Sequence, residues 1–195
     1  MKKLLFCSIQ FLLLIATDSS AQPNTGKAYK KGHSTLTIGY GIGNVWKVFL
    51  DKIVDIPEYK VKSSGPYTLV YEYGILQRFS VGAAAGYSRV RGKAEKYQLA
   101  DQITFLSLLV RANYHIWTTS ALDPYFGGGI GINNSKYKNL DQHTIISNPN
   151  SKVPNTIDFS GQVGIKYFPA KKLGVNIEAG YINGAIILVG VTTRF

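Results

Sequence analysis

The feature that most constrains this chain is an alternation of apolar with small or polar residues, in stretches of roughly ten residues. In the stretch about 66–75, for example, Tyr67, Leu69, Tyr71 and Tyr73 share one parity, and most residues between them are small or polar. Because successive side chains of a β-strand point to opposite sides, this period of two predicts strands with one apolar face.

The same pattern recurs along the chain and predicts eight strands. They cover residues 35–42, 66–75, 79–88, 103–116, 124–133, 156–168, 173–181 and the end of the chain. The connections after the second, fourth and sixth strands are short, those after the first, third and fifth are long, and Asn183-Gly184 predicts a tight hairpin before the eighth. An even strand number with short turns at one end is typical of bacterial membrane barrels. The expected fold is therefore all-β: an eight-stranded antiparallel up-and-down transmembrane β-barrel.

The polar face of the strands indicates which side of the sheet meets lipid. It carries ionisable side chains among many small residues, a mixture that fits the narrow interior of an eight-stranded barrel. Turning Arg111 toward lipid in mid-strand would cost about 2–4 kcal/mol, and pairing it inside with Glu72 or Glu178 avoids this cost. We therefore expect an ion-pair cluster in the lumen, formed by Glu72, Arg111, Lys166 and Glu178.

Aromatic residues on the apolar face lie near the ends of the strands. Rings with one polar end favour the interface between membrane and water, so the placement predicts two girdles. The girdle at the long connections comprises Tyr67, Tyr87 and Tyr181, and the one at the short turns comprises Tyr73, Tyr114, Tyr167 and Phe195.

The N-terminal segment is typical of protein export. Lys2-Lys3 precedes an apolar run over 4–16, and Ser19-Ser20-Ala21 supplies small residues where a signal peptidase cuts. Cys7 is the only cysteine and lies in this segment, so no disulfide framework is expected. The expected organisation is a signal peptide over 1–21, a periplasmic tail over 22–32 and a barrel domain over 33–195, located in the bacterial outer membrane.

The chain is basic, with a formal net charge of +11, and the expected export and the scatter of the charges argue against a nucleic-acid partner. We expect an external basic loop that contains Arg89, Arg91, Lys93 and Lys96, and a second cluster that contains Lys136, Lys138 and Lys152. Such clusters are either solvated or attract the phosphates of lipopolysaccharide or another anionic partner.

The long connection over 44–65 has apolar residues at near-helical spacing, beginning with Val45, Val48 and Phe49, and Pro57 would end a helix there. The segment is either a short interfacial or partner-binding helix or a loop that packs on the barrel rim.

The histidines give little reason to expect catalysis or a metal. His33 and His115 are expected near the short turns, and only His143 is expected outside the cell, near Asp141 and Ser147. Nothing in the sequence orients these three residues as a triad, and separated histidines are poor metal ligands. We expect no catalytic, cofactor-binding or metal-binding residues.

Two segments carry a resemblance to a known family: Asp123-Pro124-Tyr125-Phe126-Gly127-Gly128-Gly129-Ile130-Gly131 and the ending Val189-Gly190-Val191-Thr192-Thr193-Arg194-Phe195. Over about 33–195 the chain resembles the OmpA/OmpX-like eight-stranded outer-membrane barrels. The resemblance implies a structural protein, an adhesin or a narrow channel blocked by internal ion pairs, without cofactors. It also implies that Phe195, Val191 and Val189 form a signal for the outer-membrane assembly machinery.

The expected function is that of an integral outer-membrane barrel with a structural or surface-interaction role. Its expected partners are outer-membrane lipid and lipopolysaccharide, the assembly machinery, and other surface or envelope proteins. Two alternatives stay open: a narrow or gated pore for small solutes or ions, and an exported lipocalin-like barrel that binds a ligand.

Overall fold

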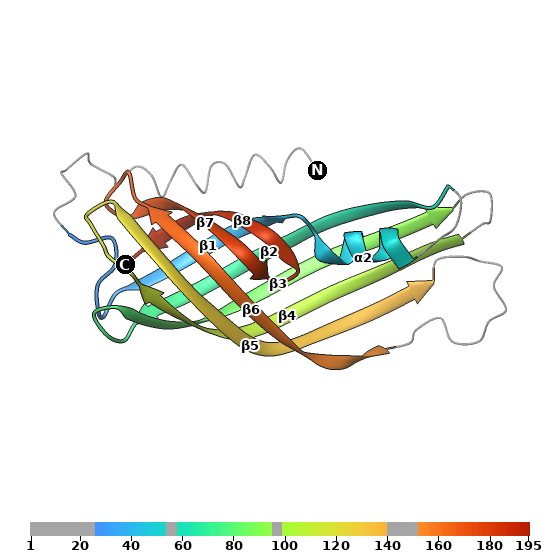
Figure 1. Cartoon of the computed structure of the whole chain (residues 1–195), viewed down its shortest axis with the longest axis horizontal. Helices are drawn as coiled ribbons and strands as arrows, with labels where there is room; N and C mark the ends of the chain where they lie inside the picture. The colour runs from blue at the N-terminus through green and yellow to red at the C-terminus, as the bar shows by residue number, and fades with distance from the viewer. Residues whose placement is uncertain (1–25, 54–57, 95–98, 140–151) are drawn as a thin grey trace.

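The computed structural model of the chain describes residues 26–53, 58–94, 99–139 and 152–195 and shows a closed barrel of eight strands (Figure 1). Each strand pairs antiparallel with the next, and β8 pairs with β1 to close the wall. The strands are β1 (Ser34–Ile42), β2 (Lys60–Gly74), β3 (Phe79–Ala94), β4 (Leu99–His115), β5 (Leu122–Asn139), β6 (Lys152–Tyr167), β7 (Leu173–Ile182) and β8 (Ala185–Arg194). The predicted up-and-down barrel is confirmed.

The two ends of the barrel differ, and we name them by their connections. The turn end holds the short connections after β2, β4 and β6, together with the seam where Ser34 and Phe195 exchange backbone hydrogen bonds of 2.9 and 3.0 Å. The loop end holds the longer connections and the predicted tight hairpin between β7 and β8, where Asn183 and Gly184 have φ angles of 50° and 83°. Positive φ at both central residues is what such a turn requires.

The apolar side chains point away from the barrel axis. Ile157, Val110 and Ile130 are 77%, 67% and 64% exposed, whereas Arg111 and Glu178 are 1% exposed. A soluble barrel would show the opposite arrangement, because water would drive the apolar side chains inward. The outward apolar face is what a lipid environment requires, and the lipocalin-like alternative is therefore wrong.

Several strands continue further at the loop end than the sequence predicted. The expected ranges 66–75, 79–88 and 124–133 become β2, β3 and β5, which extend to Lys60, Ala94 and Asn139. Figure 1 shows β2–β6 projecting beyond β1, β7 and β8 at this end. The prediction failed because the apolar outer face marks only the lipid-facing part of a strand, whereas the backbone ladder also continues where the outer face becomes polar, as at Arg89 and Arg91 of β3.

The connection after β1 contains a helix, α2 (Val45–Ile53). Of the two interpretations of this segment, the helix indicated by the spacing of apolar residues is therefore the one that the structure shows. Its first turn packs at the loop end, where the Trp46 ring stacks on Phe105 with centroids 4.2 Å apart. Asn44 precedes the helix, accepts a 3.1 Å hydrogen bond from the Lys47 amide as an N-cap, and donates to Ser88 at 2.8 Å. No helix in the described part of the chain is long and apolar enough to cross a membrane.

Candidate functional site

The lumen is occupied by a network of ionised side chains. Arg111 on β4 reaches Glu178 on β7 through Nη2–Oε1 at 2.8 Å and Nη1–Oε2 at 3.4 Å, and both residues are 1% exposed. Tyr125 on β5 donates a 2.6 Å hydrogen bond to Oε1 of Glu178. A forked guanidinium–carboxylate pair with a further donor satisfies most of the polar atoms that burial removes from water.

A second ion pair lies beside the first one. Lys166 on β6 binds Oε2 of Glu72 on β2 and also donates to Thr35 Oγ1 at 3.2 Å. Asn113 donates to Oε1 of Glu72 at 2.5 Å and itself accepts from Gln162 at 2.9 Å. The structure therefore brings all four residues of the expected lumen cluster into two neighbouring pairs, whose formal charges cancel.

Glycines on the inner face make room for these long side chains. A Cβ atom at Gly164 would lie 2.5 Å from the Tyr125 ring, and one at Gly129 would lie 2.9 Å from Cγ of Arg111. Contacts this short are not tolerated, so both positions exclude side chains. Lys166 lies 5.1 Å from the centroid of the Tyr125 ring, which links the two ion pairs through one aromatic residue.

The N-terminal tail covers the lumen at the turn end. The Tyr29 ring is 6% exposed and stacks on His115 with centroids 3.5 Å apart. Its hydroxyl donates to the carbonyls of Leu76 and Phe79 at 2.8 and 2.5 Å. Burial first, and then the carboxylates of Asp123 and Glu72, raise the pKa of Tyr29 from 10.0 to about 12. The neutral phenol is therefore the docked form.

Beneath Tyr29 lies a buried Ser–His–Asp chain. His115 Nδ1 is 2.7 Å from Asp123 Oδ1, and Nε2 is 3.1 Å from Ser80 Oγ. All three residues are 1% exposed. The stacked Tyr29 ring covers the imidazole, so the chain satisfies buried polar atoms and holds the tail. Among the described residues, no group of three or more His, Cys, Asp and Glu side chains is placed to hold a metal ion.

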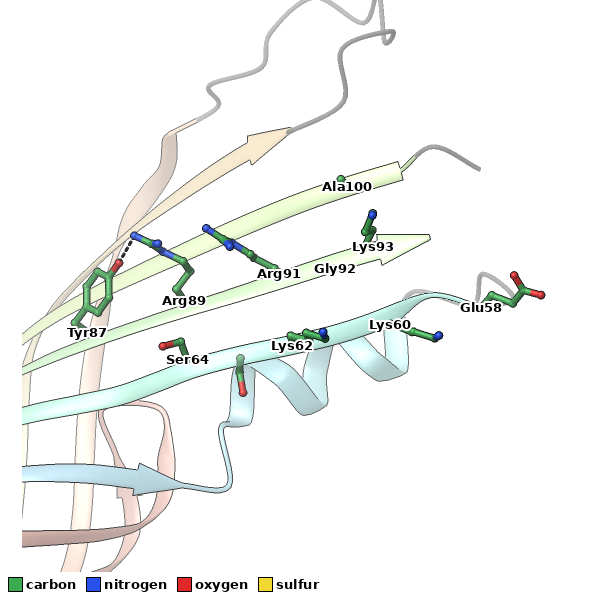
Figure 2. A pocket seen from close by; sticks show the side chains of 11 residues that line it. Glu58, Lys60, Lys62, Ser64, Tyr87, Arg89, Arg91, Gly92, Lys93 and Ala100 are labelled. Carbon is green, nitrogen blue, oxygen red and sulfur yellow. Dashed lines mark hydrogen bonds between the residues drawn. The ribbon is translucent and has the colours of Figure 1, made fainter. Parts of the chain in front are cut away.

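At the loop end, the outer face of β2 and β3 carries a basic cleft of about 900 Å³. Among the described residues, its charged lining comprises one carboxylate, Glu58, and five cations, Lys60, Lys62, Arg89, Arg91 and Lys93. Figure 2 shows two of these cations, Lys60 and Lys62, along β2 and the other three along β3. The Arg89 guanidinium donates a 2.6 Å hydrogen bond to the Tyr87 hydroxyl, and Arg91 donates to Gln102 at 2.8 Å.

A filled lumen, an outward apolar face and polar loop-end strands agree with a comparison against known families. The model of the outer membrane protein beta-barrel domain family matches residues 10–194. The chain belongs to this family. Membership places the barrel in a bacterial outer membrane, with its apolar face against lipid.

Solved structures of other outer-membrane barrels are similar to this family member. Ail, the attachment invasion locus protein of Yersinia pestis, is 16% identical, with a TM-score of 0.50 over 85% of this chain and 99% of Ail. A second Ail structure, in complex with the heparin analogue sucrose octasulfate, is 15% identical over the same shares, with a TM-score of 0.51. OprG from Pseudomonas aeruginosa is 13% identical, with a TM-score of 0.44 over 86% of this chain and 97% of OprG. No curated protein matches the sequence.

The expected external basic loop needs a correction. Arg89, Arg91 and Lys93 lie on the projecting part of strand β3 rather than in a loop, because the β2–β3 and β3–β4 ladders continue past the apolar belt. Lys96 lies outside the described residues. The same is true of the expected signal peptide over 1–21, of residues 22–25 of the expected tail, and of Pro57, Asp141, His143 and Ser147.

Sequence reasoning missed Tyr125, which completes the ion-pair network in the lumen, and Tyr29, which covers the lumen at the turn end. Tyr125 could have been found, because the outward assignment of Phe126 places its neighbour inside. The docking of Tyr29 had no signal of this kind, since the tail has no period that links it to His115. The expected assembly residues Phe195, Val191 and Val189 are 63%, 44% and 38% exposed on the outer face of β8 and just beyond its end.

Replacing Arg111 with methionine tests the first ion pair. The single variant leaves Glu178 buried without its cation, so we expect a loss of about 3–5 kcal/mol in the free energy of unfolding. The double variant Arg111→Met, Glu178→Gln removes both charges and should recover most of that loss. Urea unfolding in phospholipid vesicles measures both, with the exposed Lys171→Met as control. Equal losses in the single and double variants would contradict the pairing.

Replacing Tyr29 with phenylalanine tests the tail plug. At pH 9 the phenol is protonated in both folded and unfolded chains, and its hydrogen bonds should make the wild type more stable by about 1 kcal/mol. Above pH 10 the unfolded phenol ionises while the folded one keeps its proton until about pH 12, so this advantage should fall as the pH rises. Urea unfolding of both proteins at several pH values measures the difference. A difference that stays constant from pH 9 to 12 would contradict the docking of Tyr29.

Proposed function

We propose that this barrel is a closed scaffold that presents a rigid, cationic sheet face to anionic partners at the cell surface. The observation that carries the proposal is the projection of β2–β5 beyond the apolar belt, with cations in register on its outer face. Strands hold these cations more firmly than a loop would, because backbone hydrogen bonds fix their spacing. Short periplasmic turns and longer external connections are the family pattern, so the loop end faces outward in this proposal.

The complex of Ail with a heparin analogue supports this proposal by analogy. Sucrose octasulfate carries many anionic groups on one disaccharide, and the described lining of the basic cleft has five cations and one carboxylate. Charges of one sign in a cleft attract counter-charged partners over several ångströms and lose strength as salt screens them. The proposed partners are therefore sulfated or phosphorylated glycans.

Binding to an immobilised sulfated polysaccharide tests the surface role. We expect the barrel in lipid nanodiscs to bind at low salt and to be released as salt rises. Lys60→Gln, Lys62→Gln, Arg91→Gln together should weaken binding by roughly a hundredfold, since each cation near an anionic surface contributes about 1 kcal/mol and 1.4 kcal/mol is tenfold. The matched control Lys31→Gln, Lys171→Gln, Lys172→Gln removes the same charge at the turn end and should bind like the wild type. Equal loss in both variants would exclude the cleft as the binding face.

The pore is the competing function, and the filled lumen argues against it. An eight-stranded barrel has an interior just wide enough for side chains, and here Arg111, Glu178 and Tyr125 meet across it. We expect no steady conductance in planar-bilayer recordings of the wild type. A steady conductance that Arg111→Ala alters would favour the pore.

The outward row of Phe195, Val191 and Val189 fits the proposed role in assembly. These side chains are accessible from the lipid side at the seam where β8 meets β1, so the assembly machinery could read them before the barrel closes.

A further inference from the structure

The cations of the projecting sheet continue beyond the cleft, across four strands. The register joins Lys62 on β2 to Arg91 on β3, Arg91 to Gln102 on β4, and Gln102 to Lys138 on β5. All four residues therefore lie on one row and one face of the sheet.

A second row lies one step closer to the membrane. It joins Ser64, Arg89, Thr104 and Lys136 on the same four strands. We name the cations of both rows, Lys62, Arg89, Arg91, Lys136 and Lys138, the cationic band. The band spans a wider front than the cleft and faces outward, away from the barrel axis.

The cationic band begins directly above the lipid-facing belt. The next row toward the turn end holds Tyr67, Tyr87 and Leu106. The two tyrosines belong to the predicted aromatic girdle. One two-residue step along a strand is about 7 Å, so the band begins within about 7 Å of the aromatic row. Aromatic girdles mark the level of the lipid headgroups. The band therefore lies where the headgroups of neighbouring outer-leaflet lipids must be.

A β-bulge in β2 turns the lysines toward this level. The register of β2 with β3 shifts between Ser64 and Tyr67, which inserts one residue into the strand. Without the shift, Lys60 and Lys62 would have the parity of Thr68 and would face the barrel interior. The bulge instead places them on the same face as Tyr67, where both are exposed.

In the part of the chain that the structure describes, no carboxylate forms an ion pair with a cation of the band. Lys62 lies directly opposite Arg91, and like charges in this position destabilise a sheet. An anion from outside the chain would relieve this repulsion between neighbouring cations.

We propose that the cationic band binds the phosphate groups of a phosphorylated glycolipid, of the lipopolysaccharide type, that lies beside the barrel in the outer leaflet. This inference rests on the proposed function and names its partner. A lipid fits better than a soluble anion for two reasons. The band faces sideways, toward the lipids that surround the barrel, and its lower row directly follows the aromatic row of the apolar belt. The acyl chains pack on rows such as Leu108 and Ile132, and the sugar phosphates meet the two rows of cations.

The test compares two lipids that differ only in phosphate. The full-length barrel is placed in phosphatidylcholine nanodiscs with a trace of bis-phosphorylated lipid A or of its dephosphorylated form, and native mass spectrometry measures the lipid retained. We expect selective retention of the phosphorylated form. Lys62→Gln, Arg91→Gln, Lys136→Gln should reduce it by roughly a hundredfold, since each cation contributes about 1 kcal/mol and 1.4 kcal/mol is tenfold.

The control variant Lys31→Gln, Lys171→Gln, Lys172→Gln should retain lipid A like the wild type, and heat-modifiable migration on gels confirms that both variants fold. Equal retention of the two lipids, or equal loss in both variants, would overturn the inference. Displacement of lipid A by millimolar inorganic phosphate would overturn the commitment to a lipid. If the polysaccharide still binds while lipid A selectivity is absent, this inference fails and the proposed function stands. If lipid A is still retained selectively while the polysaccharide does not bind, the result contradicts the proposed function instead.

Discussion

The structure depends on pairing charges inside a wall whose outside is apolar. Moving an ion from water into a low-dielectric interior costs several kcal/mol, and only close pairing with added hydrogen bonds offsets this cost. Arg111–Glu178 and Lys166–Glu72 satisfy this condition with four ionised groups of zero net charge, and Tyr125 and Asn113 supply further donors. The strands must hold this register, because a slip of one residue would turn Arg111 to lipid and an apolar neighbour into the lumen.

At both ends of the lumen, segments outside the eight strands pack on inward-facing side chains. Tyr29 of the tail covers the Ser80–His115–Asp123 chain at the turn end, and Trp46 of α2 stacks on Phe105 at the loop end. A Ser–His–Asp arrangement does not by itself imply catalysis, since catalysis also requires access for a substrate. Here both imidazole nitrogens have a hydrogen-bonding neighbour and Tyr29 lies over the ring, which fits an anchor for the tail.

The sequence was sufficient for the faces of the strands and insufficient for contacts between them. Alternation correctly placed Arg111 and Glu178 inside, because strand geometry ties parity to side. It left open whether Arg111 pairs with Glu72 or Glu178, because that choice depends on which strands lie opposite across the lumen. It also ended β3 near Tyr87, because the outer face becomes charged beyond that residue, although Val90 and Ala94 remain buried on the inner face. The bulge between Ser64 and Tyr67 had no sequence signal that alternation alone could use.

The positive charge of the chain has two populations with different physical roles. Arg111 and Lys166 lie where water is excluded, so each is matched within the chain. Lys62, Arg91 and Lys136 lie in water or headgroups, where an unmatched cation costs little by itself. Repulsion between neighbours on one rigid face nevertheless accumulates, and strands cannot spread apart to reduce it as a loop could. A sheet that keeps such cations in register stores a modest electrostatic cost that a polyvalent anion removes on binding, and a bilayer surface rich in phosphate is a permanent source of that anion.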